Sequence, residues 1–425
     1  MRLTDFARPA FLYDPRTSSD SRSKGRATSP SALDDLRVLD LSQGIAGPLC
    51  AKLLGDCGAD VVKVEPRGGE CGRRMPPFFH DESDPEKSLF FLLLNLNKRG
   101  ITLDVETPEG ARTFTALARR ADVVVETFLP GHLARLGLDH AALERVQPAL
   151  VMTSITPFGQ SGPHRDYAGD EIVAYAMSGM MSISGTTDRE PLKHGGFQAQ
   201  YEAGLNGALA TLFTLVLRDR TGIGQHVDVS TQEVVTSTLV ANQPFYSFAG
   251  GVQSRRRPGG AMFGNVMPCR DGYFVSQAGG GATWDEIADF YGRPELKDGR
   301  FADADRRIVN GPALDELLLE ATKHRTMAEM FRTASEQHRM LFGIVQTPAD
   351  LAQCAQLETR DFYQEVEHPV IGTMKVPFRL WNMTPTPVTY RRPAPMLGQH
   401  NAEVYAEWLG YGDDELTRLR DLGVI

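Results

Sequence analysis

The sequence contains 425 residues, 41% of them hydrophobic, and carries a formal net charge of −9 at pH 7. A chain of this length can bury two substantial cores, and its ordinary composition excludes the disordered and fibrous classes. The acidic balance argues against a general nucleic-acid binder, and the longest apolar run, Leu89 to Leu94, is too short to span a membrane.

The cysteines and the N-terminal segment bear on the compartment. The five cysteines are odd in number and include no C-x-x-C pair, so neither a disulfide framework nor a metal site is expected. Residues 1–35 are polar and rich in Ser and Arg, and they lack the apolar centre of a signal peptide. We therefore expect a loosely held N-terminal arm and a cytoplasmic protein with reduced thiols.

The first patterned stretch reads as strand, loop, helix and strand. Arg37 to Leu41 is typical of a buried strand, Ser42 to Gly47 forms a small-residue loop, and Pro48 fits the first turn of a helix that Gly58 ends. Val61 to Val64 is a second short strand. The N–H groups at the start of such a helix can bind a nucleotide phosphate, although the third glycine of the dinucleotide fingerprint is missing.

An arginine-bearing loop follows this unit. Arg67, Arg73 and Arg74 accompany two glycines, which fits either a solvated loop or an arm that contacts phosphate. Further on, a helix is predicted around Gly110 to Arg120, ahead of strands at Ala121–Phe128 and Ala149–Ile155. The repeated alternation predicts a doubly wound parallel α/β sheet.

After the last of these strands, the residue pattern becomes mainly helical. Helices are expected over Asp170–Gly185, with its methionines filling the core, and over Tyr201–Arg218, whose small residues favour close packing on another helix. We assign residues 36–230 to a large domain, 231–350 to a smaller domain, and 351–425 to a C-terminal part that returns to the large domain. This last part contains a predicted helix at Asn401–Leu409.

Six segments follow one another in a fixed order: IAGPLCAKLLGDCGADVVKVE (45–65), NKRGITLDVETPEG (97–110), ADVVVETFLPG (121–131), TPFGQSGP (156–163), RTGIGQHVDVS (220–230) and APMLGQHN (394–401). Together they resemble the family III CoA transferases, the formyl-CoA transferase and CaiB/BaiF group that includes α-methylacyl-CoA racemases. The resemblance implies a Rossmann-like large domain plus a smaller α/β domain, and two chains interlocked as a homodimer. It also implies binding of coenzyme A or acyl-CoA, with each active site between domains.

The resemblance assigns coenzyme A contacts by position. It places the adenosine end beside residues of the first helix and of the segment around 103–105, and the CoA channel where the family has Asn-Phe. It adds one phosphate-contacting arginine and a second arginine near another such position. The residues implied are Ile45, Ala46, Leu103, Val105, Thr127, Phe128, Arg135 and Arg67.

The chain departs from the family at the catalytic carboxylate. In the transferases an aspartate attacks the acyl thioester, and here the matching position, four residues before Gly204, is Gln200. An amide is a feeble nucleophile, so the usual covalent route should be lost. Three carboxylates are candidates to replace the aspartate: Asp170, Glu171 and Glu202. Structural roles compete with this, since Asp170 and Glu171 also suit a helix N-terminus.

Three functions follow from the resemblance. The first is transfer of CoA between an acyl-CoA and a small carboxylic acid, which the basic loop Arg255 to Asn265 would recognise unless it is merely solvated. The second is an isomerase, epimerase or eliminating enzyme in which Asp170 or Glu171 moves a proton. The third is a non-catalytic CoA-binding subunit in a hetero-oligomer with an active homologue.

Overall fold

The large sheet has six parallel strands in the order β3-β2-β1-β4-β5-β6. The computed structural model describes residues 31–255, 262–278, 281–338 and 340–425. The predicted doubly wound parallel α/β class is confirmed, and the strand order is that of a Rossmann sheet. Strands are added outward in one direction from β1 to β3 and in the other direction from β4 to β6. The strands are β1 (Arg37–Asp40), β2 (Asp60–Glu65), β3 (Lys98–Thr102), β4 (Val123–Glu126), β5 (Val151–Thr156) and β6 (His226–Ser230).

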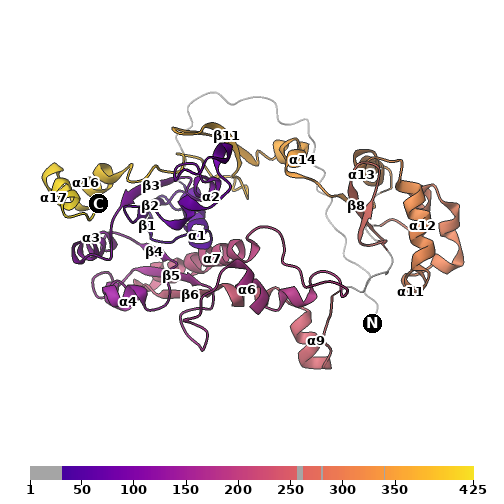
Figure 1. The fold of residues 1–425 in the computed structure, drawn as a ribbon, viewed down its shortest axis with the longest axis horizontal. Helices are drawn as coiled ribbons and strands as arrows, with labels where there is room; N and C mark the ends of the chain where they lie inside the picture. The colour runs from indigo at the N-terminus through magenta and orange to yellow at the C-terminus, as the bar shows by residue number, and fades with distance from the viewer. Residues whose placement is uncertain (1–30, 256–261, 279–280, 339) are drawn as a thin grey trace.

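Helices cover both faces of this sheet because the strand side chains alternate and both sets are apolar. In β4, Val123 and Val125 face one core, whereas Val124 faces the other. The first face packs against α1 (Ala46–Asp56) and α7 (Gln198–Thr221). The second face is covered by α3 (Pro108–Ala118), α4 (His132–Leu136), α5 (His140–Leu143), α16 (Asn401–Leu409) and α17 (Asp413–Asp421). Figure 1 shows the C-terminal helices beside the sheet.

The predicted close packing of the 201–218 helix on another helix is confirmed. Gly204 and Gly207 of α7 are buried against α1 and the sheet. A Cβ at Gly204 would lie 2.6 Å from the Ala46 carbonyl oxygen, closer than such atoms approach in proteins. Glycine is therefore required there for the backbones of α1 and α7 to meet, and this contact lies at the carboxyl edge of the sheet.

The middle of the chain forms a separate lobe (Figure 1). Its three-stranded antiparallel sheet has its own apolar core, formed between Met262 and Ile344. The lobe contains β7 (Val266–Pro268), β8 (Tyr273–Gln277), β9 (Leu341–Ile344), α10 (Trp284–Tyr291), α11 (Ala304–Val309), α12 (Gly311–Thr322) and α13 (Met327–Glu336). The predicted domain limits at residues 231 and 350 stay predictions, as does the arm, of which residues 1–30 lie outside the described part.

The remaining elements belong neither to the six-stranded sheet with its covering helices nor to the core of the lobe. The helix predicted over 170–185 is shorter, because Gly179 adopts a positive φ of 88° after α6 and a 3-10 turn follows. Met177 is 46% exposed, so its predicted core role is wrong. These elements are α2 (Leu89–Leu94), α6 (Glu171–Met177), α8 (Thr231–Ser237), α9 (Asn242–Ala249), α14 (Pro348–Ala352), α15 (Ala355–Thr359), β10 (Tyr363–His368) and β11 (Gly372–Pro377). Within the described ranges, no helix has both the length and the apolar character needed to cross a bilayer.

Candidate active site

Two cavities lie at the carboxyl edge of the large sheet, where the chain leaves the paired strands β1 and β4 for opposite faces of the sheet. The Gln200 cavity, of about 330 Å³, is lined by residues that include Ala46, Thr127, Asp170 and Gln200. The Leu103 cavity, of about 160 Å³, has mostly apolar walls that include Leu103, Val105 and Phe128. Gln43 lines both cavities, and Thr127 precedes Phe128, so the two spaces adjoin across the loops after β1 and β4. Ligands of open α/β sheets bind at such a switch point.

A buried charge network fixes the loop after β1. Lys98 donates to Asp40 Oδ2 at 2.8 Å, and Lys63 lies 3.6 Å from the other carboxylate oxygen of Asp40. Although burial raises the pKa of Asp40, these two ammonium groups outweigh burial and lower it. Burial lowers the pKa of Lys98 to about 8. Since Asp40 also accepts from the Ser42 N–H at 3.0 Å, the network holds the start of the loop.

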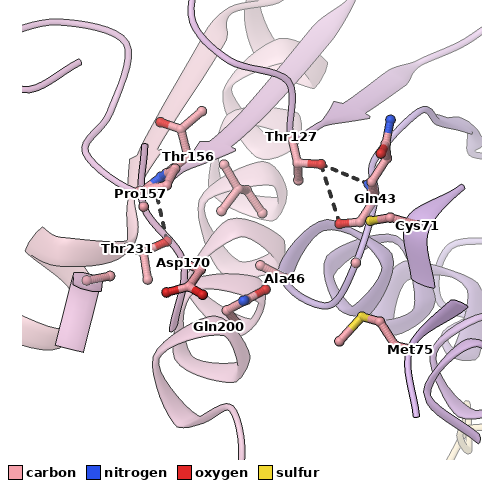
Figure 2. A pocket seen from close by; sticks show the side chains of 14 residues that line it. Gln43, Ala46, Cys71, Met75, Thr127, Thr156, Pro157, Asp170, Gln200 and Thr231 are labelled. Carbon is pink, nitrogen blue, oxygen red and sulfur yellow. Dashed lines mark hydrogen bonds between the residues drawn. The ribbon is translucent and has the colours of Figure 1, made fainter. Parts of the chain in front are cut away.

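The loops after β1 and β4 are joined directly. The Gln43 N–H donates to Thr127 Oγ1 at 2.8 Å, and Figure 2 shows this pair on one side of the Gln200 cavity. Gly47 packs behind it, because a Cβ there would lie 2.7 Å from the Thr127 methyl carbon. The first turn of α1 reaches the cavity at Ala46, and no side chain caps the N-terminus of α1 in the described structure.

Asp170 and Gln200 project into the same cavity from α6 and α7 (Figure 2). The link between the two helices is Glu171, which is 5% exposed. Its carboxylate accepts from the N–H groups of Ala199 at 3.2 Å and Gln200 at 3.1 Å, and it lies 3.5 Å from Lys193 Nζ. Glu171 thus stabilises the start of α7 and orients Gln200. Asp170 occupies the N-cap position of α6 but makes no side-chain capping bond there.

Glu202 does not line the Gln200 cavity. Its side chain is half-buried on α7, and burial together with the nearby Glu171 raises its pKa. Of the three carboxylates considered from sequence, the structure brings Asp170 to the cavity, places Glu171 behind it as a structural acceptor, and leaves Glu202 outside the cavity lining.

The positions implied for coenzyme A divide into three groups. Ala46 and Thr127 line the Gln200 cavity, and Leu103, Val105 and Phe128 line the Leu103 cavity. Ile45 is fully buried at the N-cap of α1. The remaining two arginines are exposed and outside both linings: Arg67 donates to the Gly423 carbonyl at 3.5 Å, and Arg135 lies 3.1 Å from His132 Nδ1.

Arg73 has neither of the two roles considered for its loop. It is fully buried and makes a two-pronged contact with Glu65, with N–O distances of 2.6 and 2.8 Å. Its neighbours Cys71 and Met75 line the Gln200 cavity, and the sequence reasoning missed both of them. The opposite charges of Glu65 and Arg73 at the two ends of a short Gly-rich loop were the available signal for a structural pair.

The chain is similar to proteins of known activity and structure. The model of CoA-transferase family III matches residues 33–401. A succinyl-CoA–D-citramalate CoA-transferase of Chloroflexus aurantiacus is 33% identical over 403 residues, 93% of this chain and 98% of the relative. A formyl-CoA:oxalate CoA-transferase of Streptomyces avermitilis is 33% identical over 419 residues, 93% of this chain and 99% of the relative.

The chain is also similar to solved structures of CAIB/BAIF family proteins. A crystal structure of a CAIB/BAIF family protein from Brucella suis has a TM-score of 0.79 at 31% identity and covers 89% of this chain and 100% of that one. The family match spans both the large sheet and the separate lobe. The chain therefore belongs to CoA-transferase family III and is an enzyme of that class.

Proposed function

We propose that the protein transfers coenzyme A between an acyl-CoA and a small carboxylic acid, with the carrier lying across the two adjoining cavities. The apolar walls of the Leu103 cavity suit the adenine ring, and the Gln200 cavity is then left for the thioester and the acids. The Thr127–Phe128 turn separates them, which suits the pantetheine arm between the two ends of the carrier. The exposed Arg67 and Arg135 are assigned to phosphate contacts at the rim.

We assign the nucleophile to Asp170. The observation that carries this assignment is that Asp170 is the one of the three candidate carboxylates that lines the Gln200 cavity. Its carboxylate is exposed and makes no capping bond, whereas Glu171 already accepts two N–H groups. Gln200, at the position that matches the family aspartate, then serves as a hydrogen-bond donor, since an amide cannot form the exchangeable anhydride.

The chemistry balances in four steps. An Asp170 oxygen attacks the acyl carbon of the thioester. The C–S bond breaks and CoA leaves as a thiolate, which leaves a mixed anhydride between Asp170 and the acyl group. The thiolate attacks the aspartyl carbonyl, which releases the donor acid and leaves an aspartyl-CoA thioester. The acceptor carboxylate attacks that thioester to form a second anhydride and free thiolate. The thiolate then takes the acceptor acyl group and regenerates Asp170, while N–H groups at the start of α1 stabilise oxyanions.

The test is trapping of the covalent intermediate. After incubation with succinyl-CoA, intact-mass spectrometry should detect an adduct on the wild type that hydroxylamine removes and converts to a hydroxamate at Asp170. Asp170→Asn should abolish the adduct and the exchange, whereas Asp219→Asn, at an exposed site on α7, should retain both. An adduct that persists in Asp170→Asn would contradict the assignment. Gln200→Asp tests the matching position, where a gain in exchange rate is expected.

The other two functions predict different results. An isomerase or epimerase would exchange solvent deuterium at the acyl α-carbon without any adduct, because Asp170 would move a proton instead. A non-catalytic subunit would bind CoA and show neither adduct nor exchange, and an active homologue would be needed to restore turnover. Either set of results would contradict the proposal that this chain transfers coenzyme A by itself.

We infer that two copies assemble as a homodimer. Apolar side chains form an exposed stripe along α7, where Phe213 is 67% exposed, and such a stripe favours an interface. Figure 1 shows the lobe apart from α1, α6 and α7, which carry or adjoin Ala46, Asp170 and Gln200 of the cavity lining, so a second copy is better placed to cover that cavity. The stripe consists of Leu205, Leu209, Phe213, Val216 and Leu217. The loop proposed to recognise the acceptor acid is left as a prediction, because residues 256–261 lie outside the described part.

A further inference from the structure

Glu126 is a buried carboxyl group that the proposed chemistry does not use. It ends β4, is 4% exposed, and points to the sheet face opposite α1, where it lines a third cavity of about 320 Å³. Strand register aligns it with Ser154 of β5 and, through Ser154, with Asp228 of β6. The side chain thus lies directly beneath the turn that separates the two cavities proposed to hold coenzyme A.

The contacts of Glu126 lead to that turn. Its Oε2 accepts from the Phe128 N–H at 2.7 Å, while Thr127 Oγ1 accepts from Gln43 on the other face at 2.8 Å. The Phe128 ring, which lines the Leu103 cavity, also stacks on His132 with ring centroids 4.7 Å apart. The turn is therefore held from both faces of the sheet, and Glu126 supplies the backbone contact from below.

We propose that Glu126 is a positioning residue whose carboxylate fixes the Thr127–Phe128 turn for coenzyme A binding. This rests on the proposed function, because it requires the carrier to cross that turn. Glu126 itself lines neither the Gln200 cavity nor the Leu103 cavity. Its loss should therefore weaken binding of coenzyme A and raise KM, and leave kcat at saturation unchanged.

The surroundings of Glu126 make its charge sensitive to pH. Burial raises its pKa to about 7, hydrogen bonds from Ser154 and the Phe128 N–H oppose the rise, and Asp228 adds to it. Around the third cavity, α5 contributes His140 and its N-cap residue is Asp139, the loop after β5 contributes Arg165, and β6 contributes His226 and Asp228. The residues from α4 are the apolar Leu133 and Ala134.

Neither Arg165 nor His226 is placed as a dedicated positive partner of the Glu126 carboxylate. Arg165 is ion-paired with Asp166 at 3.1 Å. Burial and His140 lower the pKa of His226, which shares a hydrogen bond of 2.8 Å with Ser154. A carboxylate accepts a stronger hydrogen bond than a neutral carboxyl group, so protonation of Glu126 near neutral pH weakens its hold on the Phe128 N–H.

The experiment is calorimetric titration of the full-length protein with coenzyme A between pH 6 and pH 8.5. The set is wild type, Glu126→Gln, Glu126→Asp and the control Glu144→Gln, which removes an exposed carboxylate after α5. At pH 8 we expect Glu126→Gln to bind about fivefold more weakly than wild type, the difference between charged and neutral hydrogen-bond acceptors. Glu126→Asp should recover part of the affinity. The difference in affinity between wild type and Glu126→Gln should vanish by pH 6. Glu144→Gln should bind like the wild type at every pH, because titration of the CoA phosphates affects both proteins equally.

A second measurement uses the wild type alone, so its result does not depend on whether Glu126→Gln folds. In wild-type protein, hydrogen exchange of the peptide that contains Phe128 should become less protected, after correction for the intrinsic rate, as pH falls from 8 to 6. Equal affinities of wild type and Glu126→Gln at pH 8, or a difference that is constant with pH, would overturn the proposal, as would unchanged protection. Wild type that does not bind coenzyme A at all would refute the proposed function, and with it this inference.

Discussion

Replacing Arg73 by Met removes the cation of the best-connected buried ion pair near the site. Arg73 and Glu65 are both fully buried, and the guanidinium also donates to Glu86 at 2.8 Å and to the Pro395 carbonyl at 3.0 Å. It lies 3.7 Å from the ring centroid of Phe91. Although burial lowers the pKa of Arg73, Glu65 and Glu86 outweigh burial and raise it, so the charged form is favoured in the fold.

The expected loss follows from Glu65, which is fully buried and loses its ionic partner. Removing one partner of a buried pair costs about 3–5 kcal/mol, and the half-exposed Glu86 adds little. The free energy of unfolding of Arg73→Met should therefore fall by about 3–5 kcal/mol. The double variant Arg73→Met/Glu65→Met should recover most of this, because two apolar side chains of similar volume leave no unpaired charge.

Urea denaturation followed by tryptophan fluorescence measures this loss. Trp408 is buried in the core of the large sheet, and a Trp284→Phe background removes the signal of the lobe. Arg74→Met is the matched control, since the neighbouring Arg74 is exposed, and no measurable change is expected. A loss below about 1 kcal/mol, the range of surface ion pairs, would refute the reasoning. A double variant as unstable as the single one would refute it equally.

Three further predictions concern the helix contact, the buried carboxyl group and the assembly. Gly204→Ala should lower the free energy of unfolding by about 1–3 kcal/mol, measured by urea denaturation, because its Cβ would meet the Ala46 carbonyl oxygen at 2.6 Å. Glu126 has a raised pKa of about 7 against an ordinary 4.5, so its ionised form opposes folding and stability falls as pH rises between these values. Glu126→Gln should therefore stabilise by about 3 kcal/mol at pH 8 and only about 1 kcal/mol at pH 5, and equal gains at both pH values would contradict this. Phe213→Arg, on the exposed stripe of α7, should yield monomers in analytical ultracentrifugation, and an unchanged mass would exclude that stripe from the interface.

Most of the sheet could be predicted from sequence because β1, β2, β4 and β5 each carry a local signal. The apolar runs of β1, β2, β4 and β5 and the turn residues between them are local patterns, and so is the Thr107 cap of α3, whose Oγ1 accepts from the Gly110 N–H at 3.0 Å. β3 was not foreseen as a strand. Its Lys98 and Arg99 read as polar, and they are buried only because partners from distant segments, such as Asp40 and Glu403, neutralise them.

The composition of the site depended on contacts that sequence spacing does not reveal. Asp170 and Gln200 are 30 positions apart, and Glu171 brings them together by binding the first N–H groups of α7. The carboxyl group of Glu126 was overlooked because it ends an apolar strand, where the alternation of side chains decides which face it occupies. The same alternation sends Thr127 to one face, where its Oγ1 accepts from the Gln43 N–H, and Glu126 to the other.

A crystal structure of the protein in complex with coenzyme A tests the central claim most directly. The account predicts the adenine ring among Leu103, Val105 and Phe128, and the sulfur atom in the cavity that Gln200 and Asp170 line. Coenzyme A bound away from the carboxyl edge of the large sheet, or a sulfur atom pointing away from Asp170, would contradict it.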